Sequence, residues 1–229
     1  MQTITERLAS VQERIAVACE AAGRKVTEVR LLPVSKFHGA RDVRTLAGLG
    51  CGSFGESQVQ ELASKAAALE DLDLTWVFLG HLQTNKAGLL ARTAHEFQAL
   101  DSERAAAALQ RGLEASDRTM DVLLEVNSSG EASKFGLNPD EVPRLAEALV
   151  RYPRLRPRGL MTLAANTPDG RIVAASFETM VALRDRLRAE SPGEWHELSM
   201  GMSGDLELAI AHGATCVRVG TAIFGPRVN

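Results

Sequence analysis

A single lysine, Lys36, follows the apolar run 31–35 and precedes the polar and glycine residues His38 and Gly39. Most lysines at the end of a strand are simply solvated. A lysine amine can instead attack an aldehyde when it is neutral, and desolvation or a nearby cation lowers its pKa from the usual value of about 10.4. Lys36 is therefore a candidate for forming a Schiff base, provided that other residues supply a pocket for the aldehyde.

Two glycine-rich segments near the C-terminus, 199–204 and 220–225, could bind a phosphate. Glycines let backbone amides approach an anion closely, and Ser203 and Thr221 add hydroxyl donors. Each segment alone also suits a tight turn, and Ser203 could merely cap the helix that follows. Asp205, in the first turn of that helix, would repel a phosphate, so we expect its side chain to face solvent. If both segments meet in the fold, phosphate binding is the better interpretation.

Arg218 lies in the apolar segment 216–220 and is flanked by valines. Because strand side chains alternate between faces, Arg218 shares a face with Cys216 and Gly220. On an interior face it would be a buried cation that needs hydrogen-bond acceptors, whereas at a rim it would form an ordinary salt bridge. The sequence leaves both arrangements open.

Three other polar residues are weaker candidates. His81 could pack beside a ligand, but a histidine in such a loop more often hydrogen-bonds locally. Asn127 begins a sequence typical of a turn, and Lys134 is most simply a surface charge. The histidines and cysteines have no spacing typical of metal ligands, so we expect no metal site.

An alternation of strands and helices must position these residues. Thr3 and Glu6 form a capping-box sequence that starts a leading helix, which ends near Gly23. After it we expect strands at 31–35, 53–55, 76–79, 96–100, 121–126, within 155–163, 197–200 and 216–220. The expected helices between them span 40–49, 57–69, 85–92, 102–115, a segment opening at Asn138, 171–190 and 205–212, and the final helix merges with the C-terminal tail.

This alternation argues for a parallel sheet, and eight repeats in 229 residues argue for a closed (β/α)8 barrel of the TIM type, with 1–229 as a single domain. An open doubly wound sheet would usually carry a glycine-rich turn after its first strand, where this chain has Ser35 and Lys36. Barrel active sites lie at the carboxyl ends of the strands, and the loops after strands seven and eight often bind phosphate.

Lys36 would therefore lie across the barrel mouth from a phosphate-binding cup. An aldehyde that carries a phosphate suits this arrangement. Pyridoxal 5′-phosphate (PLP) fits that description, and so does a sugar phosphate held as a Schiff base in an aldolase-type enzyme. The residue types do not separate these two ligands.

The composition excludes several classes of protein. A formal net charge of −3 and the lack of a basic tract argue against nucleic-acid binding through phosphate neutralisation. Cys19, Cys51 and Cys216 are widely spaced and indicate free thiols in a reducing compartment. The N-terminal residues form no apolar signal core, and no apolar run is long enough to span a bilayer. We expect a cytoplasmic protein that binds neither nucleic acid nor membranes.

The chain resembles the pyridoxal phosphate homeostasis family, whose single-domain PLP-binding barrel is related to the barrel of alanine racemase. The resemblance extends from the first expected strand to the last residues. It is carried by Val34-Ser35-Lys36, Phe54-Gly55-Glu56, Val59-Gln60-Glu61, Gly80-His81-Leu82-Gln83-Thr84-Asn85-Lys86, Val126-Asn127, Gly159-Leu160-Met161-Thr162, Leu198-Ser199-Met200-Gly201-Met202-Ser203 and Val217-Arg218-Val219-Gly220-Thr221-Ala222-Ile223-Phe224-Gly225.

This resemblance implies a barrel of PLP fold type III in which Lys36 forms the Schiff base and Arg218 faces the pyridine nitrogen of PLP. The other residues expected at the cofactor are Val34, His81, Met161, Ser199, Met200, Gly201, Ser203, Gly220 and Thr221. Ser203 and the amides of Gly220 and Thr221 are expected to hold the phosphate. Ser57 and Gly204 depart from the family, which usually has asparagine and aspartate there, so one pocket contact is in doubt and one acid near the phosphate is missing.

The resemblance also implies a protein without an established reaction, which buffers or delivers PLP and thereby influences vitamin B6 and amino-acid metabolism. An arginine at the pyridine nitrogen should keep it unprotonated and weaken the ring as an electron sink. A racemase also needs a second acid–base group, which alanine racemase obtains as a tyrosine through a further domain. The only tyrosine of this chain, Tyr152, is expected at the opposite end of the barrel.

We therefore expect a non-catalytic PLP-binding protein with racemase activity that is absent or trace. PLP-dependent apo-enzymes are candidate partners, and we expect a monomer or weak dimer. The alternative is a PLP-dependent racemase-like enzyme, or another Schiff-base enzyme, that acts on an unidentified small substrate.

Overall fold

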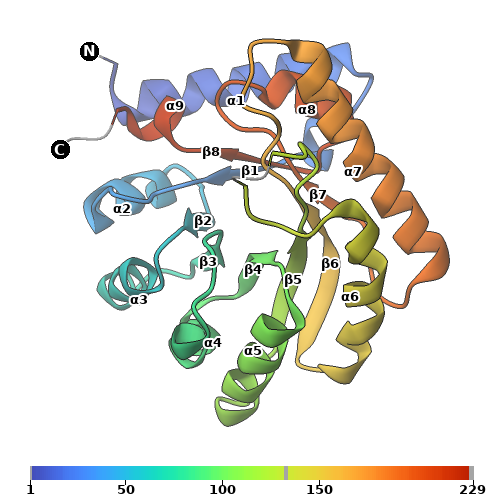
Figure 1. Ribbon diagram of the computed structural model, residues 1–229. Helices are drawn as coiled ribbons and strands as arrows, with labels where there is room; N and C mark the ends of the chain where they lie inside the picture. Colours follow the sequence, from blue (N-terminus) through green and yellow to red (C-terminus); the bar gives the residue numbers. More distant parts are fainter. Residues whose placement is uncertain (1, 132–133, 227–229) are drawn as a thin grey trace.

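The structure, a computed structural model, describes residues 2–131 and 134–226. Within these ranges, eight parallel strands form a barrel that is surrounded by helices (Figure 1). The strands are β1 (Arg30–Pro33), β2 (Ser53–Glu56), β3 (Thr75–Phe78), β4 (Glu96–Leu100), β5 (Met120–Glu125), β6 (Leu155–Met161), β7 (Glu197–Ser199) and β8 (Cys216–Val219). The predicted (β/α)8 barrel with a leading helix is confirmed.

Closure of the barrel places Lys36 at its mouth. The hydrogen-bonded strand order runs β1-β8-β7-β6-β5-β4-β3-β2. Beyond the end of β1, a parallel bridge between Val34 and Gly55 joins β1 to β2. The Ser35 amide adds a hydrogen bond of 2.9 Å to the Gly55 carbonyl. Lys36 therefore follows directly on the segment that closes the barrel.

The leading helix α1 (Ile4–Ala21) begins with the predicted capping box, because the Glu6 amide donates to the Thr3 hydroxyl at 3.2 Å and the Thr3 amide donates to the Glu6 carboxylate at 2.7 Å. In Figure 1, α1 lies along α8 and α9. The remaining α-helices are α2 (Ala40–Gly48), α3 (Val59–Ala68), α4 (Ala87–Thr93), α5 (Glu103–Ala115), α6 (Val142–Ala148), α7 (Gly170–Glu190), α8 (Leu206–Ala211) and α9 (Thr221–Phe224). Within the described ranges, no helix combines the length and apolarity needed to cross a bilayer.

Most element ends lie within two residues of the predicted ones, and the exceptions have local causes. Asn138 caps a short 3₁₀ turn, Pro139–Glu141, and α6 begins only at Val142. The final helix is a separate single turn, α9, rather than a merged tail. β1 ends at Pro33 because Val34 pairs only through the isolated bridge to Gly55.

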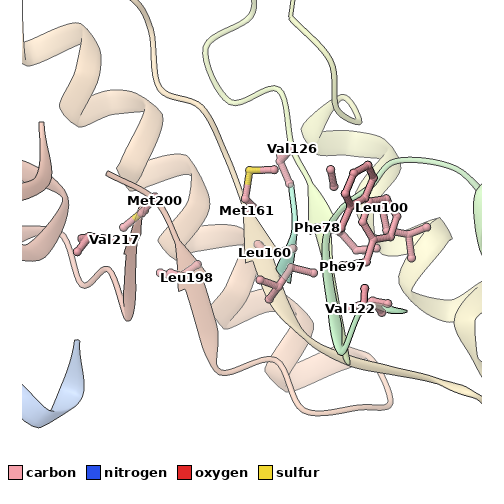
Figure 2. Close-up of a cluster of buried hydrophobic side chains, with 14 of the residues drawn as sticks. Phe78, Phe97, Leu100, Val122, Val126, Leu160, Met161, Leu198, Met200 and Val217 are labelled. Atoms are coloured by element: carbon pink, nitrogen blue, oxygen red, sulfur yellow. The ribbon is translucent and has the colours of Figure 1, made fainter. Parts of the chain in front are cut away.

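Most apolar side chains pack between the strands and the surrounding helices. Figure 2 shows part of this core, in which Leu160 lies on β6, Leu198 on β7 and Phe97 on β4. A separate small cluster, formed by Leu32, Val77 and Cys216, lies inside the barrel, since side chains from β1, β3 and β8 can meet only there.

Charged side chains that form ion pairs occupy the amino end of the barrel interior. Arg30 on β1 donates two hydrogen bonds of 2.8 Å to Glu96 on β4 and one of 3.3 Å to Glu197 on β7. A bidentate arginine–carboxylate pair of this kind satisfies charges that burial would otherwise penalise. The ion pairs occupy the end of the barrel opposite Lys36, which leaves the carboxyl end available for a ligand.

Candidate functional site

A cavity of about 390 Å³ opens at the carboxyl end of the barrel, within the size range of small-molecule sites. Its walls come from the residues at and beyond the ends of β1, β2, β3, β6, β7 and β8. The lining residues are Val34, Lys36, Ser57, Leu79, Met161, Leu163, Met202, Ser203, Gly204, Arg218, Gly220 and Thr221. The cavity thus lies where the barrel prediction places a functional site.

Lys36 is half-buried at the wall of this cavity. None of the residues at 2–131 and 134–226 forms a hydrogen bond or an ion pair with its side chain. An amine that is not held by a carboxylate remains available to a ligand in the cavity.

The two glycine-rich segments meet at the cavity, as predicted. Ser203 and Gly204 line it from the loop after β7, and Gly220 and Thr221 line it from the segment after β8. The Ala222 amide donates a hydrogen bond of 3.4 Å to the Ser203 hydroxyl and so connects the two segments. Together they offer hydroxyl groups and backbone amides to an anion.

The backbone of the loop after β7 requires glycine at one position. Gly201 has a φ of +93°, and a Cβ there would lie 2.6 Å from the Cβ of Ala209. Asp205 accepts a hydrogen bond of 2.6 Å from the Met202 amide, so its carboxylate is bound to its own loop. The Asp205 side chain is half-buried and is absent from the lining of the cavity, so it lies neither fully in solvent nor against the expected phosphate site.

Arg218 is an interior cation and not a rim salt bridge, since it is only 5% exposed. Its Nη1 donates to the Ser199 hydroxyl at 2.8 Å, and its Nη2 donates to the Thr162 carbonyl at 2.7 Å. The Ser199 hydroxyl in turn donates to Gln98 Oε1 at 2.6 Å. Burial lowers the pKa of Arg218 because desolvation penalises its charge. The hydrogen bonds from the barrel interior fix the guanidinium beside the cavity.

Glu125, at the end of β5, is a buried carboxyl that is not among the site residues predicted from the sequence. It is 5% exposed, and among the described residues its Oε2 has no hydrogen-bond partner. Burial, and then the charge of Asp101, raise the pKa of Glu125 to about 7, against an opposing effect of Arg218. The available signal in the sequence is an acid directly after the apolar run 122–124.

The structure brings most of the predicted cofactor residues to the cavity. Those that line it are Val34, Lys36, Met161, Ser203, Arg218, Gly220 and Thr221. Ser199 lies behind Arg218 as its hydrogen-bond acceptor. Met200 is fully buried in the apolar core shown in Figure 2, and Gly201 is buried next to it. These two residues therefore support the cavity from behind its wall.

His81 is not brought to the cavity. Its Nδ1 lies 3.1 Å from an Asp101 carboxylate oxygen, and its ring stacks on Phe135 with 4.9 Å between the ring centroids. His81 instead lines a neighbouring hollow with Ser57 and Gln83. This placement corresponds to the simpler interpretation of His81 as a residue that interacts within and between loops.

Three apolar lining residues, Leu79, Leu163 and Met202, are absent from the predicted set. An apolar side chain in a loop carries no chemical signal by which a sequence pattern could assign it to a site. Ser57 and Gly204, at which the resemblance implies a departure from the family pattern, both line the cavity.

Comparisons of the sequence with known proteins identify close relatives. The sequence model of the alanine racemase N-terminal domain matches residues 7–228. A pyridoxal phosphate homeostasis protein of Pseudomonas aeruginosa is 43% identical over 227 residues, which cover 99% of this chain and 97% of the relative. A protein of the same name from Aquifex aeolicus is 40% identical over 97% of both chains.

Solved structures show the same architecture. The structure of PipY from Synechococcus elongatus with PLP bound superposes with a TM-score of 0.83 at 34% identity. The superposition covers 97% of this chain and 100% of the PipY chain. The same protein without PLP gives a TM-score of 0.87 at 35% identity. Alanine racemase of Streptomyces coelicolor, at 19% identity and a TM-score of 0.72, shares the fold over 95% of this chain and 58% of its own.

Proposed function

The chain belongs to the family of pyridoxal phosphate homeostasis proteins, and we propose that it binds PLP through a Schiff base on Lys36 without catalysing a reaction of its own. One observation carries this proposal. Three groups line the same cavity: a lysine amine that has no polar partner among the described residues, a buried guanidinium, and a cup of hydroxyls and amides. These three groups correspond in chemistry to the aldehyde, the ring nitrogen and the phosphate of PLP.

The residues of the cavity fit each part of this cofactor. Lys36 would bond to the aldehyde carbon, and Arg218 would donate a hydrogen bond to the pyridine nitrogen. Ser203 and the amides of Gly220 and Thr221 would hold the phosphate. Met161, which Figure 2 shows next to Val126, belongs to the apolar wall that would cover the ring.

Two features support binding over catalysis. Bound PLP acts as an electron sink most strongly when its ring nitrogen is protonated, whereas an arginine donor favours the unprotonated nitrogen. The only tyrosine of the chain, Tyr152, precedes β6 and so lies at the amino end of the barrel. Its hydroxyl donates to Glu103 at 2.8 Å. Tyr152 therefore cannot supply a second acid–base group at the cavity.

The proposal includes transfer of the bound cofactor to PLP-dependent apo-enzymes. Leu163 and Met202, which line the cavity, are each 40% exposed, so its mouth presents apolar surface to the outside. Such surface suits a transient contact with an acceptor protein. Transfer is tested by comparing the rate at which an apo-enzyme is reactivated by the PLP-loaded chain and by the same concentration of free PLP.

Titration with PLP tests covalent binding. The wild-type chain should gain a visible absorbance band with about one equivalent of PLP, and Lys36→Ala should gain none. Lys25→Ala, which removes an exposed lysine, serves as the matched control and should behave as wild type. A wild-type chain that stays colourless with PLP contradicts the binding proposal. Racemisation of alanine by the loaded chain at an enzyme-like rate contradicts its non-catalytic part.

A further inference from the structure

The backbone on both sides of Lys36 is held by two side chains of α3. The Ser35 carbonyl accepts a hydrogen bond of 2.7 Å from Lys65 Nζ. The Phe37 amide donates a hydrogen bond of 2.7 Å to Glu61 Oε1. These groups belong to the peptide units that precede and follow the Lys36 Cα, so both planes that set its backbone conformation are fixed.

The two side chains belong to a buried ion cluster. Lys65 Nζ lies 2.6 Å from Glu56 Oε1 and 2.8 Å from Glu61 Oε1. The Ser35 hydroxyl donates to the same Glu56 oxygen at 2.5 Å. Lys65 is 6% exposed and Glu56 is fully buried, so solvent does not compete for the contacts of Glu56 with Lys65 and Ser35, whereas Glu61 is partly exposed. Burial of this kind makes the geometry of the cluster well defined.

The cluster also stabilises an unusual backbone conformation. Phe37 has a φ of +67°, in the left-handed region that a bulky residue seldom adopts. Such a conformation persists where neighbouring groups hold it, and it is found most often at functional sites. The hydrogen bond from the Phe37 amide to Glu61 provides one such contact directly after Lys36.

By contrast, the Lys36 side chain reaches the cavity wall without a polar partner among the residues that the structure describes. Its placement must therefore come from its backbone. The residues that hold this backbone, Glu61 and Lys65, are absent from the lining of the cavity.

We propose that Glu61 and Lys65 are positioning residues, which orient Lys36 so that its amine meets the ligand aldehyde at the bonding distance. This inference rests on the proposed function. A positioning role governs the covalent step, because misplacement of a reacting group slows reaction without removing the contacts that bind the ligand. The phosphate cup is formed by the segments after β7 and β8, and none of its residues belongs to the cluster.

Two ligands separate the covalent step from binding. PLP can bond to Lys36, whereas pyridoxine 5′-phosphate has a hydroxymethyl group in place of the aldehyde and can only bind non-covalently. The variant to compare is Glu61→Ala, which removes the acceptor of the Phe37 amide but leaves the ion pair of Lys65 with Glu56. Lys65→Met would leave Glu56 buried without its cation, so loss of stability would obscure the result.

We expect Glu61→Ala to slow covalent attachment of PLP by between about tenfold and a hundredfold. Its affinity for pyridoxine 5′-phosphate should change by less than about twofold, since the phosphate contacts remain. Glu61→Gln keeps an acceptor oxygen for the Phe37 amide and should recover most of the rate. Glu70→Ala, at an exposed position beyond the end of α3, is the matched control.

Stopped-flow absorbance gives the attachment rate, and calorimetry gives the affinity for pyridoxine 5′-phosphate. An attachment rate in Glu61→Ala equal to that of wild type overturns the inference. An equal fold-decrease in the attachment rate of PLP and in the affinity for pyridoxine 5′-phosphate also overturns the inference, because that pattern indicates a merely structural role. A wild-type chain that forms no adduct is recognised before any variant is compared, and it overturns the proposed function and the inference together.

Discussion

Arg218 and Ser199, on adjacent strands β8 and β7, form a buried hydrogen bond of 2.8 Å beside the cavity. The Ser199 hydroxyl donates a hydrogen bond to Gln98 Oε1 at 2.6 Å, and Gln98 Nε2 donates to Glu96 Oε1 at 2.5 Å. The guanidinium that lines the cavity is thus the end of a chain of hydrogen bonds that crosses the barrel interior.

Replacement of Ser199 by alanine should destabilise the fold. The change leaves Arg218 Nη1 and Gln98 Oε1 buried without these partners, which should lower the free energy of unfolding by about 1–3 kcal/mol. Urea denaturation measures the effect, with Ser64→Ala on the exposed surface of α3 as the control. Equal midpoints for Ser199→Ala and the control would show that the buried hydrogen bonds contribute nothing to stability.

The buried Glu125 should make stability depend on pH. Its pKa is raised from the usual 4.5 to about 7, so the folded state holds a proton that the unfolded state releases. The stabilisation from this proton is present below pH 4.5 and is lost as the pH rises to about 7. Above about pH 7, the free energy of unfolding of the wild type should therefore be lower than below pH 4.5 by up to roughly 3 kcal/mol. The free energy of unfolding of Glu125→Gln should show no such loss.

The measurement for Glu125 is the unfolding free energy of wild type and Glu125→Gln at pH 5 and pH 7.5. Because the glutamine does not titrate, the difference between the two proteins should shift in favour of the variant at the higher pH. Parallel pH dependences would contradict the assignment of a raised pKa to Glu125.

Two glycines of the loop after β7 should respond differently to alanine. Gly201→Ala places a Cβ 2.6 Å from that of Ala209 at a φ of +93°, so it should cost about 1–3 kcal/mol and weaken PLP binding. Gly204 lines the same cavity, but a Cβ there meets nothing within 4 Å. Gly204→Ala should therefore leave stability unchanged. Thermal melting and PLP titration of both variants provide the comparison, and equal losses would refute the steric explanation.

Arg14 of α1 should support the phosphate-binding cup from outside the barrel. It donates a hydrogen bond of 2.9 Å to the Ser203 carbonyl and forms a bidentate pair with Glu207 at 2.6 and 2.9 Å. Arg14→Ala should weaken PLP binding roughly fivefold, the equivalent of one hydrogen bond. Binding of pyridoxal, which lacks the phosphate, should change less.

Titrations of PLP and pyridoxal against Arg14→Ala and Arg44→Ala provide the test. Arg44 forms an exposed ion pair with Asp71 on another part of the surface, so its removal should affect neither ligand. An equal effect of Arg14→Ala on both ligands would place its role outside the phosphate cup.

The sequence pattern was sufficient to predict the barrel, and together with the resemblance to a known family it predicted most of the cavity wall. Strands alternate with helices throughout the chain, so the carboxyl ends of the strands could be read off directly. Strand alternation also put Arg218 on the same face as Cys216, and both are buried. The sequence left open whether Arg218 is interior or at the rim, and the structure shows it buried with the Ser199 hydroxyl and the Thr162 carbonyl as acceptors.

The remaining features depend on contacts between segments that are distant in sequence. His81 could not be assigned because its partners, Asp101 and Phe135, lie in other loops. Met200 follows the end of the short strand β7, and its side chain is buried in the apolar core. It therefore lies behind the cavity wall and not in the wall, where it was predicted to lie. The hydrogen bond from Lys65 to the Ser35 carbonyl likewise joins α3 to the end of β1. A local sequence pattern cannot predict a contact between two such segments.

Reductive trapping tests the central claim most directly. The PLP-loaded chain is treated with borohydride, digested and analysed by mass spectrometry to find the lysine that carries the reduced cofactor. We predict about one equivalent on Lys36 and no stable label in Lys36→Ala. A label spread over surface lysines, or a Lys36→Ala variant that is trapped as fully as wild type, would contradict the assignment of Lys36 as the residue that holds PLP.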